Sequence, residues 1–140
     1  MNDEFNQDEE DWCARTRERA IDYLKSQAGL VFGEVGEWPA WHVAPYVSIW
    51  AVESVAHPGS VGWWVIAGDL PTDYCSAGGA RDPKLAIRRI AARWLEAVKA
   101  TGANDIEIGE TGLPVSLLPL LQARADMLLE FAEDEQLWQD

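Results

Sequence analysis

The sequence predicts an α+β fold, in which a small antiparallel sheet built on a central β-hairpin packs between three helices. Residues 46–55 and 61–69 are neighbouring runs rich in β-branched and aromatic side chains, with a turn sequence between them. Three other segments, 9–28, 82–101 and 118–135, repeat apolar residues at helical spacing. Alternating strand–helix units and glycine-rich phosphate-binding motifs do not occur, which argues against a nucleotide-binding α/β fold.

The length of 140 residues, 48% of them hydrophobic, suits one domain with its own core. We expect residues 1–8 to be a flexible acidic segment and residues 9–138 to form a single α+β domain. The N-terminus is acidic rather than basic and then apolar, and no apolar run reaches the roughly 20 residues that span a bilayer. The expected location is therefore the cytoplasm.

The first helix is expected over 9–28, since one half of its wheel gathers apolar residues and Gly29 follows as a stop. Residues 30–45 contain several glycines and prolines, which leaves room for a short strand near 30–35 and then an irregular aromatic segment. In the hairpin, Pro58 and Gly59 are expected at the centre of the turn, which would place Glu53 opposite Trp64. Both faces of this hairpin are apolar, so both must be covered.

Residues 70–81 are expected to form a loop. Asp82 and Pro83 then make a strong helix start, an N-cap followed by proline at the first helical position, and the helix should end at Gly102. Residues 105–108 are compatible with a short strand, and the last helix is expected over 118–135.

Acidic residues are concentrated at the two ends of the chain. The net charge is −13, and residues 1–11 and 130–140 hold eleven of the 24 acids and no Lys or Arg. Such a balance repels nucleic acid and anionic membrane. Solubility alone accounts for the acidic ends more simply, but a basic protein partner is the interaction that they would favour.

The two cysteines and two histidines have no metal-ligand spacing, so we expect free thiols and neither metal nor cofactor. A nucleophilic Cys75–His42 pair would require the fold to bring these two residues together.

Two segments hold candidate ligand-binding residues. The first is a proline-flanked loop rich in rings, and the second follows the hairpin with carboxylates beside a phenol; packing and turn formation are the simpler explanations for both. The six candidates are Trp38, Trp41, His42, Asp69, Asp73 and Tyr74.

Arg17 and Arg124 fall inside the apolar stripes of the first and last helices, and Glu53 falls on an apolar strand face. Because a buried guanidinium needs an acceptor, we expect at least one of these arginines to pair with Glu53.

The strings WCARTR, GEVGEWPAWHVAPYVSIWAVES, PGSVGWWVIAGDLPTDY and ARWLE resemble a bacterial family described as a domain of unknown function, made of small acidic, Trp-rich single-domain proteins. The resemblance covers residues 9–138 and implies a stand-alone cytoplasmic protein without indicating an activity. Two functional hypotheses follow. The first is a non-catalytic interaction or inhibitor-like protein, similar in size and acidity to immunity proteins. The alternative is a small-molecule-binding or hydrolytic protein with a site in the 38–46 and 68–75 loops.

Overall fold

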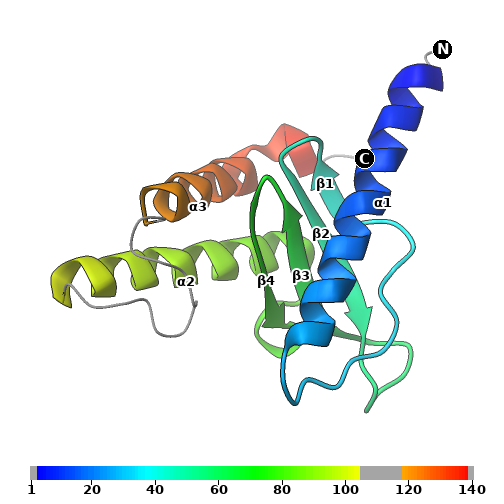
Figure 1. The fold of residues 1–140 in the computed structure, drawn as a ribbon, viewed down its shortest axis with the longest axis horizontal. Helices are drawn as coiled ribbons and strands as arrows, with labels where there is room; N and C mark the ends of the chain where they lie inside the picture. Colours follow the sequence, from blue (N-terminus) through cyan, green and yellow to red (C-terminus); the bar gives the residue numbers. More distant parts are fainter. Residues whose placement is uncertain (1–2, 105–117, 139–140) are drawn as a thin grey trace. The chain divides into compact units, whose positions relative to one another are not determined.

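The computed structural model describes residues 3–104 and 118–138 (Figure 1). Along the chain they form three helices and a four-stranded antiparallel sheet, which confirms the expected α+β class. The chain divides into two compact units, Met1–Ala86 and Ile87–Asp140, and each is described by itself. The expectation of one domain over 9–138 stays a prediction, and the strand expected over 105–108 lies outside the described residues.

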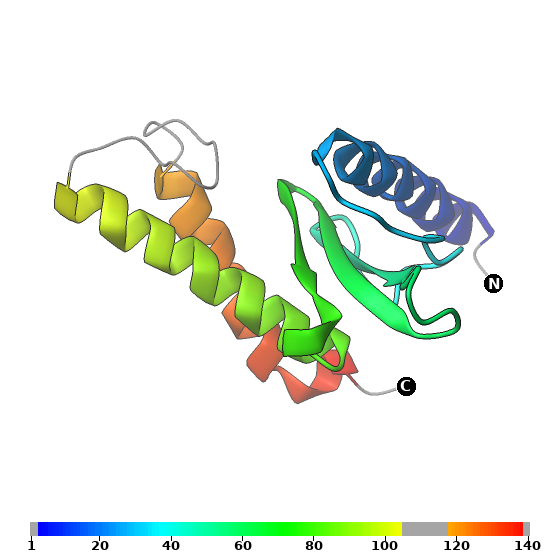
Figure 2. The same cartoon turned by 90° about the horizontal axis from the view of Figure 1, so that it is seen from below.

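Helix α1 (Asp3–Ser26) lies across one face of the sheet in the first unit (Figure 2). It begins six residues earlier than expected, at Asp3 instead of residue 9. Its buried residues recur every three or four positions, as a helix with one apolar face requires. They are Cys13, Thr16, Ala20 and Leu24.

The sheet is a meander with strand order β1-β2-β3-β4. Its strands are β1 (Trp41–Val43), β2 (Val47–Glu53), β3 (Val61–Gly68) and β4 (Leu70–Ser76). Side chains alternate between the two faces, so Trp50, Val52 and Val65 join the core beneath α1. Ile49 and Ile66, on the opposite face, are also fully buried, which confirms that both faces are covered.

The β2–β3 turn is the one that the sequence predicts, but the register is not. The Ser60 N–H donates to the His57 carbonyl at 3.0 Å, so Pro58 and Gly59 occupy the centre, with Gly59 at φ +91°. On the β2 side more residues belong to the loop than expected, because pairing resumes only where the Ser54 N–H donates to the Ser60 carbonyl. A bulge in β3 then shifts the register by one residue, so Trp64 lies opposite Ala51 rather than Glu53. The net offset is two residues, which leaves every side chain on its expected face.

Residues 70–76 form a strand, β4, and not the expected loop. Pro71 argues against a strand because it donates no ladder hydrogen bond. Here the register shifts between Ile66 and Gly68 on the β3 side, which places Pro71 in the irregular part of the pairing. In the described sheet β4 is the last strand, and an edge strand tolerates proline.

No strand forms over 30–35, although part of this segment pairs with β2. An isolated bridge joins Val35 to Val52, and the Gly36 N–H donates to the Ala51 carbonyl at 2.9 Å. The segment therefore continues the β1 side of the sheet without regular strand geometry.

The second unit contains most of α2 (Pro83–Asn104) and all of α3 (Leu118–Glu133), which lie side by side (Figures 1 and 2). The Asp82 carboxylate accepts the Leu85 N–H at 2.9 Å, confirming the expected N-cap. The helix continues past Gly102 to Asn104. On α3 the buried residues are Leu121, Ala125, Leu128 and Ala132, whereas Leu120 is exposed.

The expectation that Arg17 or Arg124 pairs with Glu53 is wrong, because Glu53 has no ion-pair partner among the described residues. Arg17 donates to the carbonyls of Gly36 (Nε, 2.8 Å) and Val35 (Nη2, 2.8 Å), while the Glu53 carboxylate accepts the Gly59 N–H at 2.8 Å in the hairpin loop. Backbone carbonyls satisfy a guanidinium as a carboxylate would, without placing a second charge in the core.

No helix in the described ranges is long and apolar enough to cross a membrane.

Candidate functional site

The six predicted site residues do not come together. Trp41 and His42 belong to β1, while Asp73 and Tyr74 belong to β4, and the two intervening strands keep these pairs at opposite edges of the sheet. Asp69 is exposed at the β3–β4 turn, where its N–H donates to the Tyr46 carbonyl at 2.9 Å. A single pocket built from all six side chains is therefore not what this fold provides.

Trp38 occupies the centre of a three-residue bulge at one sheet edge. The Gly36 N–H donates to the Ala51 carbonyl at 2.9 Å and the Ala40 N–H donates to the Ile49 carbonyl at 2.8 Å, so residues 37–39 lie between two hydrogen bonds to β2. Pro39 has no backbone N–H that could donate to β2, which favours an interruption of the regular hydrogen-bond ladder at residues 37–39. We call residues 37–39 the Trp38 bulge.

Trp38 is 57% exposed, compared with 46% for Tyr46. Core packing, the simpler explanation that the sequence suggests for this loop, does not account for the exposure of Trp38. The other tryptophans behave differently: Trp50 and Trp94 are fully buried, and Trp64 is nearly so.

Arg17 fixes the base of the Trp38 bulge. Its two hydrogen bonds to the Val35 and Gly36 carbonyls hold the backbone immediately before Glu37 against α1. Both bonds are charge-assisted and partly buried, which makes them stronger than neutral surface bonds. The exposed indole thus stands on a braced backbone rather than on a free loop.

His42 takes part in a second cluster, between β1 and α1. Its Nε2 lies 2.6 Å from Glu9 Oε2, and its ring centroid lies 6.2 Å from that of Trp12. The His42 and Glu9 side chains are 29% and 35% exposed, so water reaches the pair. Neighbouring strand residues face opposite sides, which directs Trp41 away from this cluster.

Asp73 and Tyr74 belong to an aromatic cluster at the other edge. The Asp73 carboxylate accepts the Tyr74 N–H at 2.8 Å and the Tyr23 hydroxyl at 3.3 Å. The Tyr74 ring meets those of Tyr23 and Trp63 edge-on, with centroids 5.9 and 5.6 Å away. These contacts attach α1 to β4 and give both predicted residues a packing role.

The two cysteines are buried free thiols. The hypothetical Cys75–His42 pair is ruled out because β4 and β1 form opposite edges. Burial, reinforced by the nearby carboxylates of Glu9 and Glu10, raises the pKa of the Cys13 thiol above its usual value of 9.0. Cys13 is thus held in its protonated, unreactive form.

We predict that Cys13 makes the protein less stable in alkali. Since its pKa is higher in the folded than in the unfolded chain, its contribution is complete below about pH 9 and declines as pH rises through the folded-state pKa. Urea unfolding at pH 8 and pH 10 should show a smaller alkaline loss for Cys13→Ala than for the unmodified chain. Equal losses in the two proteins would contradict the assignment.

Other polar features give weaker evidence of a functional site. Within 3–104 and 118–138, no three His, Cys, Asp or Glu side chains are grouped as a metal site. On α3 a shallow, open depression is lined by Leu129, Glu130, Glu133 and Asp134.

Two connecting residues were missed by sequence reasoning. Glu9 contacts His42, and Arg19 donates to the Gly68 carbonyl at 2.7 Å. Arg19 and Arg17 thus hold opposite flanks of α1 to the sheet. The only sequence signal for Arg17 was its place in an apolar stripe, and Arg19 gave none.

A family model described as "Domain of unknown function (DUF4826)" matches residues 6–138. No curated protein and no solved structure gives a significant match.

Proposed function

This chain belongs to the DUF4826 family, and we propose that it is a non-catalytic protein-interaction protein that binds its partner through the Trp38 bulge. The exposure of Trp38 on a braced backbone is the observation that carries the proposal. Tryptophan is among the residues most enriched at the energetic centres of protein interfaces.

The energy available at this position is substantial. A tryptophan that is 57% exposed leaves on the order of 100 Å² of its surface in water, worth about 2.5 kcal/mol if a partner covers it. Since Arg17 already orders the backbone, binding would lose little additional conformational entropy there. A pre-organised aromatic anchor fits recognition of another protein better than it fits catalysis.

The acidic balance of the chain supports a basic partner. With a net charge of −13, long-range attraction would accelerate association with a cationic protein, and salt would weaken it. The inhibitor-like reading of the sequence is one form of this proposal. The small-molecule alternative loses support because its six residues separate.

We predict that Trp38→Ala weakens partner binding at least tenfold while leaving the fold intact, because an exposed ring contributes little to folding. Proteins captured from lysate of the source cells by tagged wild-type chain would be identified, purified and titrated calorimetrically against each variant. Val55→Ala, at another exposed apolar residue, is the matched control. If Trp38→Ala captured and bound the same partner with unchanged affinity, the proposal would be wrong.

A further inference from the structure

We infer that the Trp38 bulge recognises a cationic side chain, arginine above lysine, presented by a segment of the protein partner. This inference rests on the proposed function and specifies its partner chemistry. The residues that carry it are Trp38 and the two carboxylates of the same edge segment, Glu34 and Glu37.

The indole face is suited to a cation. An aromatic ring carries negative charge density on its face, and tryptophan attracts cations most strongly of the aromatic side chains. Among the described residues, the Trp38 ring has no aromatic neighbour and its N–H has no hydrogen-bond partner. The face is therefore available to an incoming group, unlike the rings of Trp63 and Tyr74, which pack against each other.

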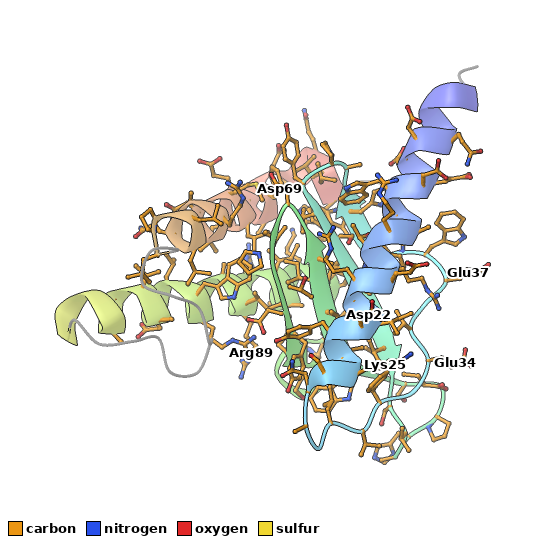
Figure 3. All side chains as sticks on the ribbon, in the orientation of Figure 1. Asp22, Lys25, Glu34, Glu37, Asp69 and Arg89 are labelled. Atoms are coloured by element: carbon orange, nitrogen blue, oxygen red, sulfur yellow. The ribbon has the colours of Figure 1, made fainter. Side chains whose placement is uncertain are left out.

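Two carboxylates supply charge complementarity. Glu34 and Glu37 are both exposed, and in Figure 3 both side chains leave the edge segment on its outer side, away from α1. Neither carboxylate has an ion-pair partner within the described part of the chain. The Arg17 guanidinium is already engaged by the backbone carbonyls of Val35 and Gly36.

Together these groups favour arginine over other partners. A guanidinium stacks on an aromatic face and donates hydrogen bonds in its plane at the same time, whereas an ammonium is a compact, strongly hydrated charge. A purely apolar partner residue would cover the ring but would leave the charges of Glu34 and Glu37 uncompensated.

The test uses the full chain labelled with 5-fluorotryptophan, whose eight fluorine resonances report on each indole separately. Trp38→Phe identifies the Trp38 resonance by its loss. An acetylated, amidated tetra-arginine peptide is titrated, followed by a citrulline peptide of equal length, which has the shape of arginine without its charge. We expect the arginine peptide to shift the Trp38 resonance selectively with a Kd on the order of millimolar, and the citrulline peptide to leave it in place.

Removing both charges, with Glu34→Gln and Glu37→Gln, should raise this Kd by roughly threefold or more. The matched control, Glu96→Gln with Glu130→Gln, removes equal charge at two exposed glutamates elsewhere and should have a smaller effect. Equal shifts with the citrulline peptide, or equal effects of the two double variants, would overturn the inference.

The two proposals fail in different ways. If Trp38→Ala abolishes capture of the partner but Glu34→Gln with Glu37→Gln does not weaken it, the bulge is an interface and the cation inference is wrong. If Trp38→Ala leaves capture unchanged, the proposed function itself fails. Sedimentation that shows only self-association, lost in Trp38→Ala, would likewise overturn the assignment to a different protein.

Discussion

Replacing Gly68 by alanine is expected to destabilise the protein by about 4 kcal/mol, enough to unfold much of a marginally stable chain. An added Cβ would overlap the Tyr46 carbonyl oxygen and lie 3.0 Å from Val47 Cα, both of them backbone atoms that cannot simply move aside. The φ of +149° adds strain for any residue with a side chain. Urea unfolding followed by tryptophan fluorescence measures the loss.

Gly59→Ala is the matched control for this effect. Gly59 also has a positive φ, +91°, but a Cβ there would meet nothing within 4 Å. Its substitution therefore isolates backbone strain, at about 1 kcal/mol, from steric overlap. A loss for Gly68→Ala no larger than that for Gly59→Ala would show that the β1–β2 turn relaxes around the new methyl group.

Arg17→Met is expected to cost about 3 kcal/mol. The substitution keeps an aliphatic side chain in the helix but removes both donors to the carbonyls of Val35 and Gly36, which are left partly buried without their charged partner. The stability of Arg17→Lys should fall between those of the unmodified chain and Arg17→Met, since one ammonium cannot donate to both carbonyls with the geometry of a guanidinium. Chemical denaturation gives the stability, and amide exchange at Gly36 reports whether the edge segment has loosened.

Arg15→Met supplies the comparison for Arg17→Met, because Arg15 is exposed on the same helix and should change stability by about 0.5 kcal/mol or less. Glu53→Gln provides a second comparison, since glutamine retains an oxygen that can accept the Gly59 N–H. Equal losses for Arg17→Met and Arg15→Met would mean that water replaces the guanidinium at no cost. The Trp38 bulge would then lack its brace.

Features fixed by neighbouring residues were predicted correctly. Asp82 and Pro83 define the start of α2 because an N-cap acts within a single turn. Pro58 and Gly59 form the hairpin turn because their backbone preferences suit its central positions. The faces of β2 and β3 were also correct despite the wrong register, since a two-residue offset preserves alternation.

Features that depend on distant segments were predicted poorly. Local chemistry at Pro71 argued for a loop, yet the chain forms β4 because the edge of a sheet needs hydrogen bonds on one side only. The candidate residues were grouped by sequence proximity and ring content, but strand order places His42 and Tyr74 at opposite edges. Nothing in composition or spacing indicates that order.

The sequence by itself determined the α+β class, the helix ends to within six residues, the turn chemistry and the two apolar faces of the central hairpin. The tertiary structure alone decided that Arg17 binds carbonyls rather than Glu53 and that Trp38 remains exposed while Trp50 is buried. The physical reason is the range of each interaction. Capping, turn preference and alternation act over a few residues, whereas a guanidinium or an indole finds its surroundings only after segments distant in the chain have met.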